Sequence, residues 1–212
     1  MGACASQRKA HNELTAAEIE AIHESWMRVK TDEIGKHILR ELITRRPKFA
    51  EYFGINGGSF ELKDLNANRQ FLLQAYRIQG FLDTAVGAIG HCPLSSVYDL
   101  AHRIGQIHFY RGVNFGADNW LIFKRVAVEE ITRVGEDKRF KSALQGEMLT
   151  AAVISPLLYE RFQASSATFL DENYVLARIA WNKLMTMIVR EMKRGFLEEA
   201  MRNCKDEESS DI

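Results

Sequence analysis

The feature that most constrains the fold is a long apolar stripe with helical periodicity between about Leu65 and Ile89. Its positions recur at alternating spacings of four and three residues, at Phe71, Ala75, Ile78, Leu82, Ala85 and Ile89. On an α-helix these positions share one face, whereas a half-buried strand would alternate every second residue. Similar stripes predict helices over about 15–29, 32–45, 119–134 and 171–201, and a further helix carrying His108 is expected between Pro93 and Gly112. With only three prolines to interrupt them, these segments predict an all-α fold.

Local signals mark several of the expected helix ends. Thr15 and Glu18 have the spacing of a capping box, so the first helix is expected to begin there. Pro47 disfavours helix at Arg46 and can open a new short turn, which separates the second helix from the segment that follows. Gly112 is expected to close the helix over 94–111.

Size and composition exclude several classes of protein. The 212 residues suit one domain, and 46% of them are hydrophobic, which is enough for a core. Lys and Arg number 28 and so do Asp and Glu, so the balanced charge gives no electrostatic case for a nucleic-acid partner. No run of 18 apolar residues is present to span a bilayer. Cys4, Cys92 and Cys204 are widely spaced, which favours reduced thiols over a zinc site.

The beginning of the chain has the pattern of a lipidation signal. Gly2 follows the initiator methionine and Ser6 lies four residues further on, as in N-myristoylated proteins. One myristoyl chain holds a protein to a membrane only weakly, so a second chain on Cys4 would be needed for stable anchoring. We therefore expect residues 1–13 to be a flexible acylated tether and 14–201 to be the folded domain. Within that domain, 137–170 reads as an insertion, and 202–212 as an acidic disordered tail.

One histidine stands out on the helix expected over 94–111. Leu100, Ile104 and His108 recur every four residues and therefore share a face. An imidazole on an apolar stripe must form a hydrogen bond, bind a metal or cofactor, or lose hydration without compensation. A hydrogen-bonded histidine is the commoner outcome, so the residues alone leave these alternatives open.

Several spaced landmarks resemble the globin family over about residues 14–134 and 171–198. Trp26 after Leu14-Thr15 looks like the first globin helix, and Pro47 followed by Phe53 looks like the corner after the second. Ile104 to His108, then Gly112-Val113, is similar to the proximal-histidine segment of neuroglobin-like members. The last helix, with Ala180-Trp181 and Arg194-Gly195-Phe196, resembles the same branch. Together with the acylation signal, the pattern looks most like nematode globins. The resemblance implies a globin fold with an extended segment before the last helix.

The resemblance also implies a site, residue by residue. His108 takes the position of the proximal histidine that ligates the iron of haem b. Gln74 takes the distal position on the other side of the iron, although a register one residue earlier would place Leu73 there. The residues that the resemblance places against the haem are Leu39, Phe53, Phe71, Ile78, Ile104 and Val113.

Gln74 departs from the usual distal histidine. A glutamine amide can donate a hydrogen bond but is a poor iron ligand. No histidine occurs between residues 38 and 90, so we expect a ferrous iron that is mainly five-coordinate and open to oxygen, carbon monoxide or nitric oxide.

Three roles remain compatible with the sequence. A protein held by acyl chains at the cytoplasmic face of a membrane, most simply the plasma membrane, suits an oxygen or redox sensor or a signalling globin. Such a globin would have a reductase partner and a side reaction with superoxide or nitric oxide. Without the anchor, the same site would serve a soluble oxygen carrier or store in the cytoplasm. A haem-free helical adaptor on the globin fold is the third reading.

Overall fold

Residues 13–55, 64–113, 116–133 and 156–210 are described by the computed structural model. Within these ranges every regular element is helical, and the isolated β-bridge found there joins Ile89 to Cys92. The all-α class is therefore confirmed. The α-helices are α2 (Ala16–Val29), α3 (Ile34–Arg45), α4 (Lys48–Tyr52), α5 (Arg69–Ala88), α6 (Leu94–Tyr110), α7 (Ala117–Ile131) and α9 (Pro156–Ser210). Two 3₁₀ turns, η1 (Lys30–Asp32) and η2 (Asp64–Ala67), precede α3 and α5.

The start of α2 follows the predicted capping box. The Thr15 backbone N–H donates to Glu18 Oε2 at 2.7 Å, and the Glu18 N–H donates to Thr15 Oγ1 at 3.2 Å. The Glu18 carboxylate also accepts a hydrogen bond from Lys183 Nζ of α9 at 2.9 Å. The cap therefore satisfies the first turn of α2 and ties that turn to α9.

Two helices begin later than their apolar periodicity predicts. The second helix was expected from Asp32, but Glu33 adopts a left-handed conformation (φ 53°) and α3 begins at Ile34. The helix expected from Leu65 begins at Arg69, because the Asn68 side chain caps it by accepting from the backbone N–H groups of Gln70 and Phe71. Periodicity does not mark where a helix begins, because an apolar residue in the preceding turn can be buried as well, as Leu65 of η2 is.

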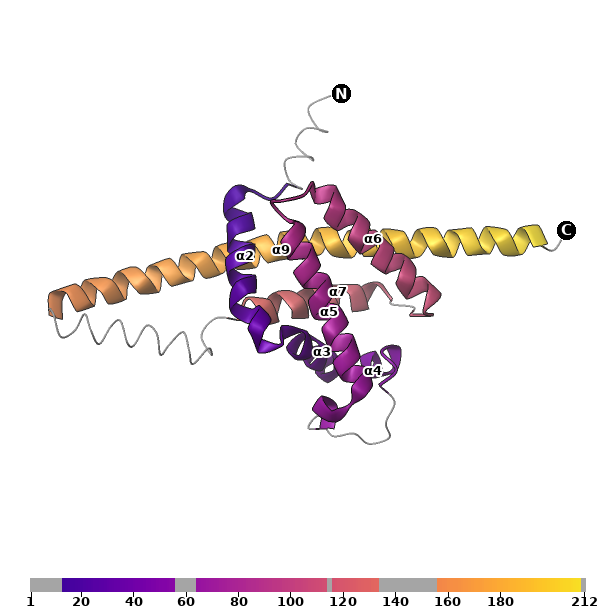
Figure 1. Cartoon of the computed structure of the whole chain (residues 1–212), viewed down its shortest axis with the longest axis horizontal. Coiled ribbons are helices and arrows are strands. Elements are labelled where there is room, and N and C mark those ends of the chain that lie inside the picture. Colours follow the sequence, from indigo (N-terminus) through magenta and orange to yellow (C-terminus); the bar gives the residue numbers. More distant parts are fainter. Residues whose placement is uncertain (1–12, 56–63, 114–115, 134–155, 211–212) are drawn as a thin grey trace, which may run out of the picture.

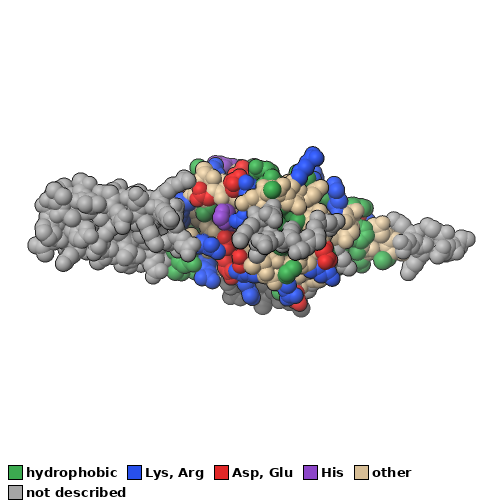
Figure 2. Space-filling view, turned by 90° about the horizontal axis from the view of Figure 1, so that it is seen from below, with side chains coloured by type: hydrophobic (Ala, Val, Ile, Leu, Met, Phe, Trp, Pro, Cys, Tyr) green, Lys and Arg blue, Asp and Glu red, His purple; other side chains and the backbone are tan. Residues whose placement is uncertain are grey.

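One helix organises the rest of the molecule. Figure 1 shows α9 running along the whole long axis, with the other helices gathered around its middle. Helices α2, α6 and α7 pack against α9, and α3 packs against α5 and α7. Figure 2 shows basic and acidic side chains interspersed over the lower face of this assembly, as expected for a balanced charge.

A pair of buried tryptophans in the core joins α2 to α9. Trp26 and Trp181 are at most 2% exposed, and their ring centroids lie 6.0 Å apart. Trp181 Nε1 donates to Ser25 Oγ at 2.7 Å, and that hydroxyl donates in turn to the Ala21 carbonyl at 2.6 Å. A buried indole N–H is thereby satisfied inside an apolar core.

Glycines allow α6 to approach α9 closely. A methyl group built on Gly105 of α6 would overlap the carbonyl oxygen of Met192 in α9. A methyl group on Gly195 of α9 would overlap the carbonyl oxygen of His102 in α6. The two backbones are therefore in direct contact on both sides of the crossing, which is possible only without Cβ atoms.

The last helix is longer at both ends than predicted. We expected it over about Asp171 to Met201, but α9 extends from Pro156 to Ser210. Residues 156–170, assigned to an insertion, continue this helix, and residues 202–210, expected to be disordered, are also helical. Pro156 suits the first position of a helix. Glycine and proline are the poorest helix formers, and between residues 157 and 210 the sequence contains no proline and one glycine, Gly195. The remainder of the insertion, 137–155, lies outside the described residues, as does the tether over 1–12.

Candidate functional site

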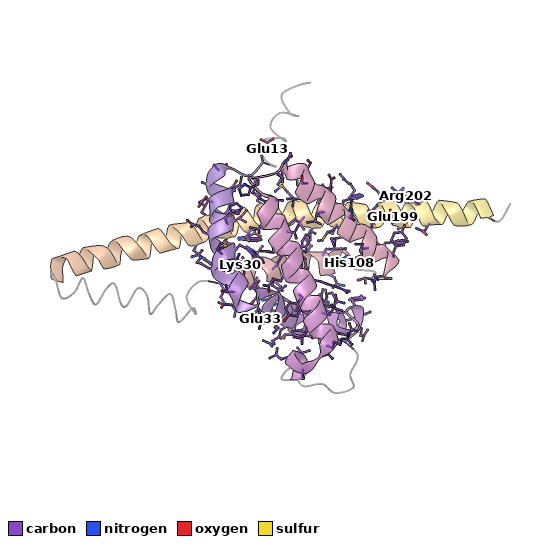
Figure 3. The ribbon with its side chains drawn as sticks, viewed as in Figure 1. Glu13, Lys30, Glu33, His108, Glu199 and Arg202 are labelled. Atoms are coloured by element: carbon purple, nitrogen blue, oxygen red, sulfur yellow. The ribbon has the colours of Figure 1, made fainter. Side chains whose placement is uncertain are left out.

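His108 lies near the end of α6 (Figure 3), on the side of that helix that contacts Trp120 of α7. Its Nδ1 atom is 2.7 Å from the carbonyl oxygen of Ile104, one turn earlier. Because a carbonyl oxygen can only accept, Nδ1 carries the hydrogen of the neutral ring. The lone pair of the neutral imidazole is then on Nε2, which is the tautomer that a metal-binding histidine needs.

The surroundings of His108 keep the ring neutral. Burial lowers the pKa of His108, and the hydrogen bond to Ile104 raises it less, so the pKa lies below its ordinary value. The Trp120 ring of α7 stands edge-on to the imidazole, with ring centroids 5.5 Å apart. At neutral pH the side chain is thus an uncharged nitrogen donor held in one orientation.

Trp120 was not among the predicted site residues. The sequence places it on the apolar face of the helix after His108, where it reads as ordinary core. Its contact with the imidazole depends on how α7 packs beside α6, and no local pattern encodes that.

The six predicted apolar residues separate into two groups. Leu39 of α3 and Phe71 of α5 are fully buried in the core. Four others are half-buried and keep part of their apolar surface uncovered: Phe53, Ile78, Ile104 and Val113. An apolar cofactor would cover the exposed apolar surface of these four side chains. Leu39 and Phe71 have no exposed surface left, so they could only pack behind the residues that contact the cofactor.

Backbone contacts connect two members of the half-buried group to the histidine. Ile104 provides the carbonyl that holds Nδ1. The backbone N–H of Val113 donates to the carbonyl of His108 at 3.0 Å, beyond the left-handed Gly112 (φ 65°). Phe53 follows α4 and stacks on Phe49 with centroids 6.1 Å apart.

Gln74 lies on α5 beside the buried stripe formed by Phe71 and Ala75. Its side chain is half-buried, whereas the neighbouring Leu73 is 41% exposed. Gln74 Oε1 accepts a long hydrogen bond of 3.4 Å from Arg77 Nη1. A contact of that length is weak, so the amide can reorient toward another partner at little cost.

His102, on the same helix as His108, has different surroundings. Its Nε2 is 3.2 Å from Glu198 Oε2, and its Nδ1 accepts from Arg194 Nε at 3.4 Å. Both ring nitrogens of His102 therefore interact with side chains of α9. In the described part of the chain, no group of three or more His, Cys, Asp or Glu side chains could hold a metal ion unaided.

The predicted lipidation residues, Gly2 and Cys4, lie outside the described residues. No helix in the described ranges combines the length and apolar character needed to cross a bilayer.

The chain is similar in sequence to a globin. No family model matches the chain. Globin CTT-V of Chironomus thummi piger is 31% identical over 107 residues, which cover 50% of this chain and 64% of that protein. The chain thus spans somewhat less than two thirds of the length of this relative. The similarity agrees with the helical architecture, and together they confirm the all-α globin fold expected from the sequence. The neuroglobin-like or nematode-type assignment stays a prediction.

Proposed function

We propose that this protein is a globin that holds haem b and reversibly binds oxygen, carbon monoxide or nitric oxide. The observation that carries this proposal is the state of His108. Its Nδ1 is fixed on the Ile104 carbonyl, and burial lowers its pKa. The similarity to a globin from Chironomus thummi piger supports the same conclusion.

The residues present fit the cofactor. Haem b, when bound, would supply an iron that needs a nitrogen ligand from the protein and can bind a diatomic gas. His108 would provide that nitrogen, because hydrogen bonding at Nδ1 orients the imidazole and increases the basicity of Nε2. The half-buried side chains of Phe53, Ile78, Ile104 and Val113 would contact the cofactor and exclude water.

Gln74 would supply a polar group for the bound gas, at the position that the resemblance implies. Its amide N–H₂ can donate a hydrogen bond to a bound gas that carries partial negative charge. A typical hydrogen bond contributes about 1 kcal/mol, which is roughly a five-fold gain in affinity. Because no histidine occurs between residues 38 and 90, we expect the gas to meet no competing imidazole.

The test is the absorbance spectrum of the purified ferrous protein with and without carbon monoxide. We expect a Soret band that shifts on adding the gas. His108→Ala should lose that band or its axial coordination, whereas His102→Ala, on the same helix but paired with α9, should keep both. A purified chain that binds no haem would refute the proposal and favour the haem-free adaptor.

We also propose that the globin is held at the cytoplasmic face of a membrane by a myristoyl chain on Gly2 and a thioester-linked chain on Cys4. The support is the sequence pattern at the start of the chain. A lipid anchor contributes little to bulk storage of oxygen and more to local signalling, so we favour an oxygen or redox sensor with a reductase partner.

Intact mass of the protein made in a eukaryotic host tests the anchor, with Gly2→Ala as the unmodified control. An unmodified Gly2 in the wild type would contradict it. Slow autoxidation with ready oxygen release would indicate a carrier instead, and rapid electron turnover with superoxide or nitric oxide would indicate signalling.

A further inference from the structure

The carboxylate of Glu199 joins α9 to the end of α6. Glu199 is only 3% exposed. Its Oε1 accepts from Gln106 Nε2 at 2.7 Å and from Arg202 Nη1 at 2.7 Å, and its Oε2 accepts from the Tyr110 hydroxyl at 2.6 Å. Figure 3 shows Glu199 and Arg202 beside the end of α6. Both carboxylate oxygens are thus engaged, and two of the three donors come from α6.

The two donors from α6 flank His108 in the sequence. Gln106 precedes it by two residues and Tyr110 follows it by two. Residues four apart share one face of a helix, and a residue midway between them points about 200° away. Glu199 therefore grips α6 from the face opposite to His108, so its hold on the helix sets the direction of the imidazole.

The carboxylate is ionised at neutral pH. The hydrogen bond from Tyr110 lowers the pKa of Glu199 most, burial raises it, and the charge of Arg202 and the bond from Gln106 lower it further. Hydrogen bonds to a charged acceptor are stronger than neutral ones. A neutral side chain of the same shape would therefore hold α6 less firmly.

Part of the last turn of α6 is exposed to solvent. Ile107 is 46% exposed and Tyr110 is 67% exposed. Phe109 of this turn packs against Phe196 of α9, with ring centroids 5.6 Å apart. Hydrogen bonds that close a partly exposed helical turn slow its local opening.

We propose that Glu199 is the positioning residue of this site: through Gln106 and Tyr110 it holds the last turn of α6 and thereby the orientation of His108. Its consequence for an axial ligand rests on the proposed function, but its hold on α6 does not.

The first test needs no cofactor. Amide hydrogen exchange of residues 106–111 is measured by mass spectrometry in the purified protein and in Glu199→Gln. Glu199→Gln removes the charge from these hydrogen bonds, and the amide keeps only weaker neutral bonds, with the Tyr110 hydroxyl turned to accept. A loss of about 1 kcal/mol predicts that exchange in this segment rises about fivefold. Glu198→Gln is the matched control, because Glu198 is the adjacent carboxylate and pairs with His102 rather than with this turn.

A second variant separates the clamp from general destabilisation. Tyr110→Phe removes only the hydroxyl and should raise exchange in the same segment. In the Glu199→Gln background it should add less than it does in the wild type, because the charge-assisted bond between the two residues is already lost. Unchanged exchange in Glu199→Gln, or an equal rise in every helix, would overturn the proposal.

A spectroscopic measurement addresses the histidine directly. In the ferrous protein without gas, the iron–histidine stretching band seen by resonance Raman should shift or broaden in Glu199→Gln and stay unchanged in Glu198→Gln. An unshifted band combined with faster exchange would refute the link to His108. A wild type with no haem would instead refute the proposed function, and the exchange test would still decide the clamp.

Discussion

Replacing Gly105 by alanine tests the close approach of α6 to α9. The added methyl group would overlap the carbonyl oxygen of Met192 and approach its carbonyl carbon to 2.8 Å. Both atoms belong to the backbone of α9, so no side-chain rotation can relieve the overlap. The helices must separate at the crossing that lies one turn before His108.

The expected cost follows from two opposing effects. Overpacking a core costs about 1–3 kcal/mol, and a clash with backbone belongs at the upper end of that range. Alanine also gains about 1 kcal/mol over glycine as a helix former. The net loss is about 2 kcal/mol, which lowers Tm by about 4–8 °C in a chain of this size.

Gly80→Ala is the matched control, because a methyl group on Gly80 of α5 meets nothing within 4 Å. There only the helix propensity changes, so stability should rise by about 1 kcal/mol. Urea unfolding followed by circular dichroism at 222 nm measures both variants. The double variant Gly105→Ala/Gly195→Ala should lose less stability than the sum of the losses of the two single variants. Either added methyl group already separates the two helices at the crossing. If Gly105→Ala gained stability as Gly80→Ala should, the direct backbone contact would be refuted.

Three further variants probe the core and the ionisable groups by the same unfolding assay. Ser25→Ala leaves the indole N–H of Trp181 without its acceptor and should cost about 1–3 kcal/mol; a neutral effect would contradict the buried bond. Thr15→Ala removes one half of the capping box and should cost about 1 kcal/mol. Burial raises the pKa of Glu18, but the hydrogen bonds from Thr15 and α9 outweigh burial, so the pKa is lowered overall. The stability that the ionised Glu18 contributes is therefore lost as pH falls through its pKa in the folded protein. Burial raises the pKa of Glu130, so Glu130→Gln should be more stable than the wild type at pH 7. That advantage should vanish below the unfolded pKa of about 4.3, and an advantage that persists at low pH would contradict the assignment.

Local signals predicted the helices well, because their causes lie within a few residues. The capping box of Thr15 and Glu18 uses contacts three residues apart, and the stripe through Phe71 and Leu82 reports one helical face. The predicted start of α5 is too early, because the buried Leu65 belongs to η2 and the Asn68 side chain caps the helix after it. Sequence reasoning thus located the elements more reliably than their ends.

The contacts around His108 were less accessible to sequence reasoning. The hydrogen bond from His108 to Ile104 is local and follows from helix geometry. Trp120 of α7 contacts the His108 ring, and Glu199 of α9 bonds the helix that carries it, so both contacts come from other elements. Such pairings depend on how helices cross, and the close crossing in turn depends on Gly105 and Gly195. Those two glycines are a visible signal, although a single sequence does not reveal which partner each one faces.

The position of α9 in the chain affects how the protein is made. The ribosome completes α2, α6 and α7 before it synthesises the surface on which they are buried, so their inner faces wait several seconds at about 5–20 residues per second. During that interval Trp26 has no Trp181 to meet. The nascent chain therefore closes its core late, and chaperones have their opportunity to bind it before α9 emerges.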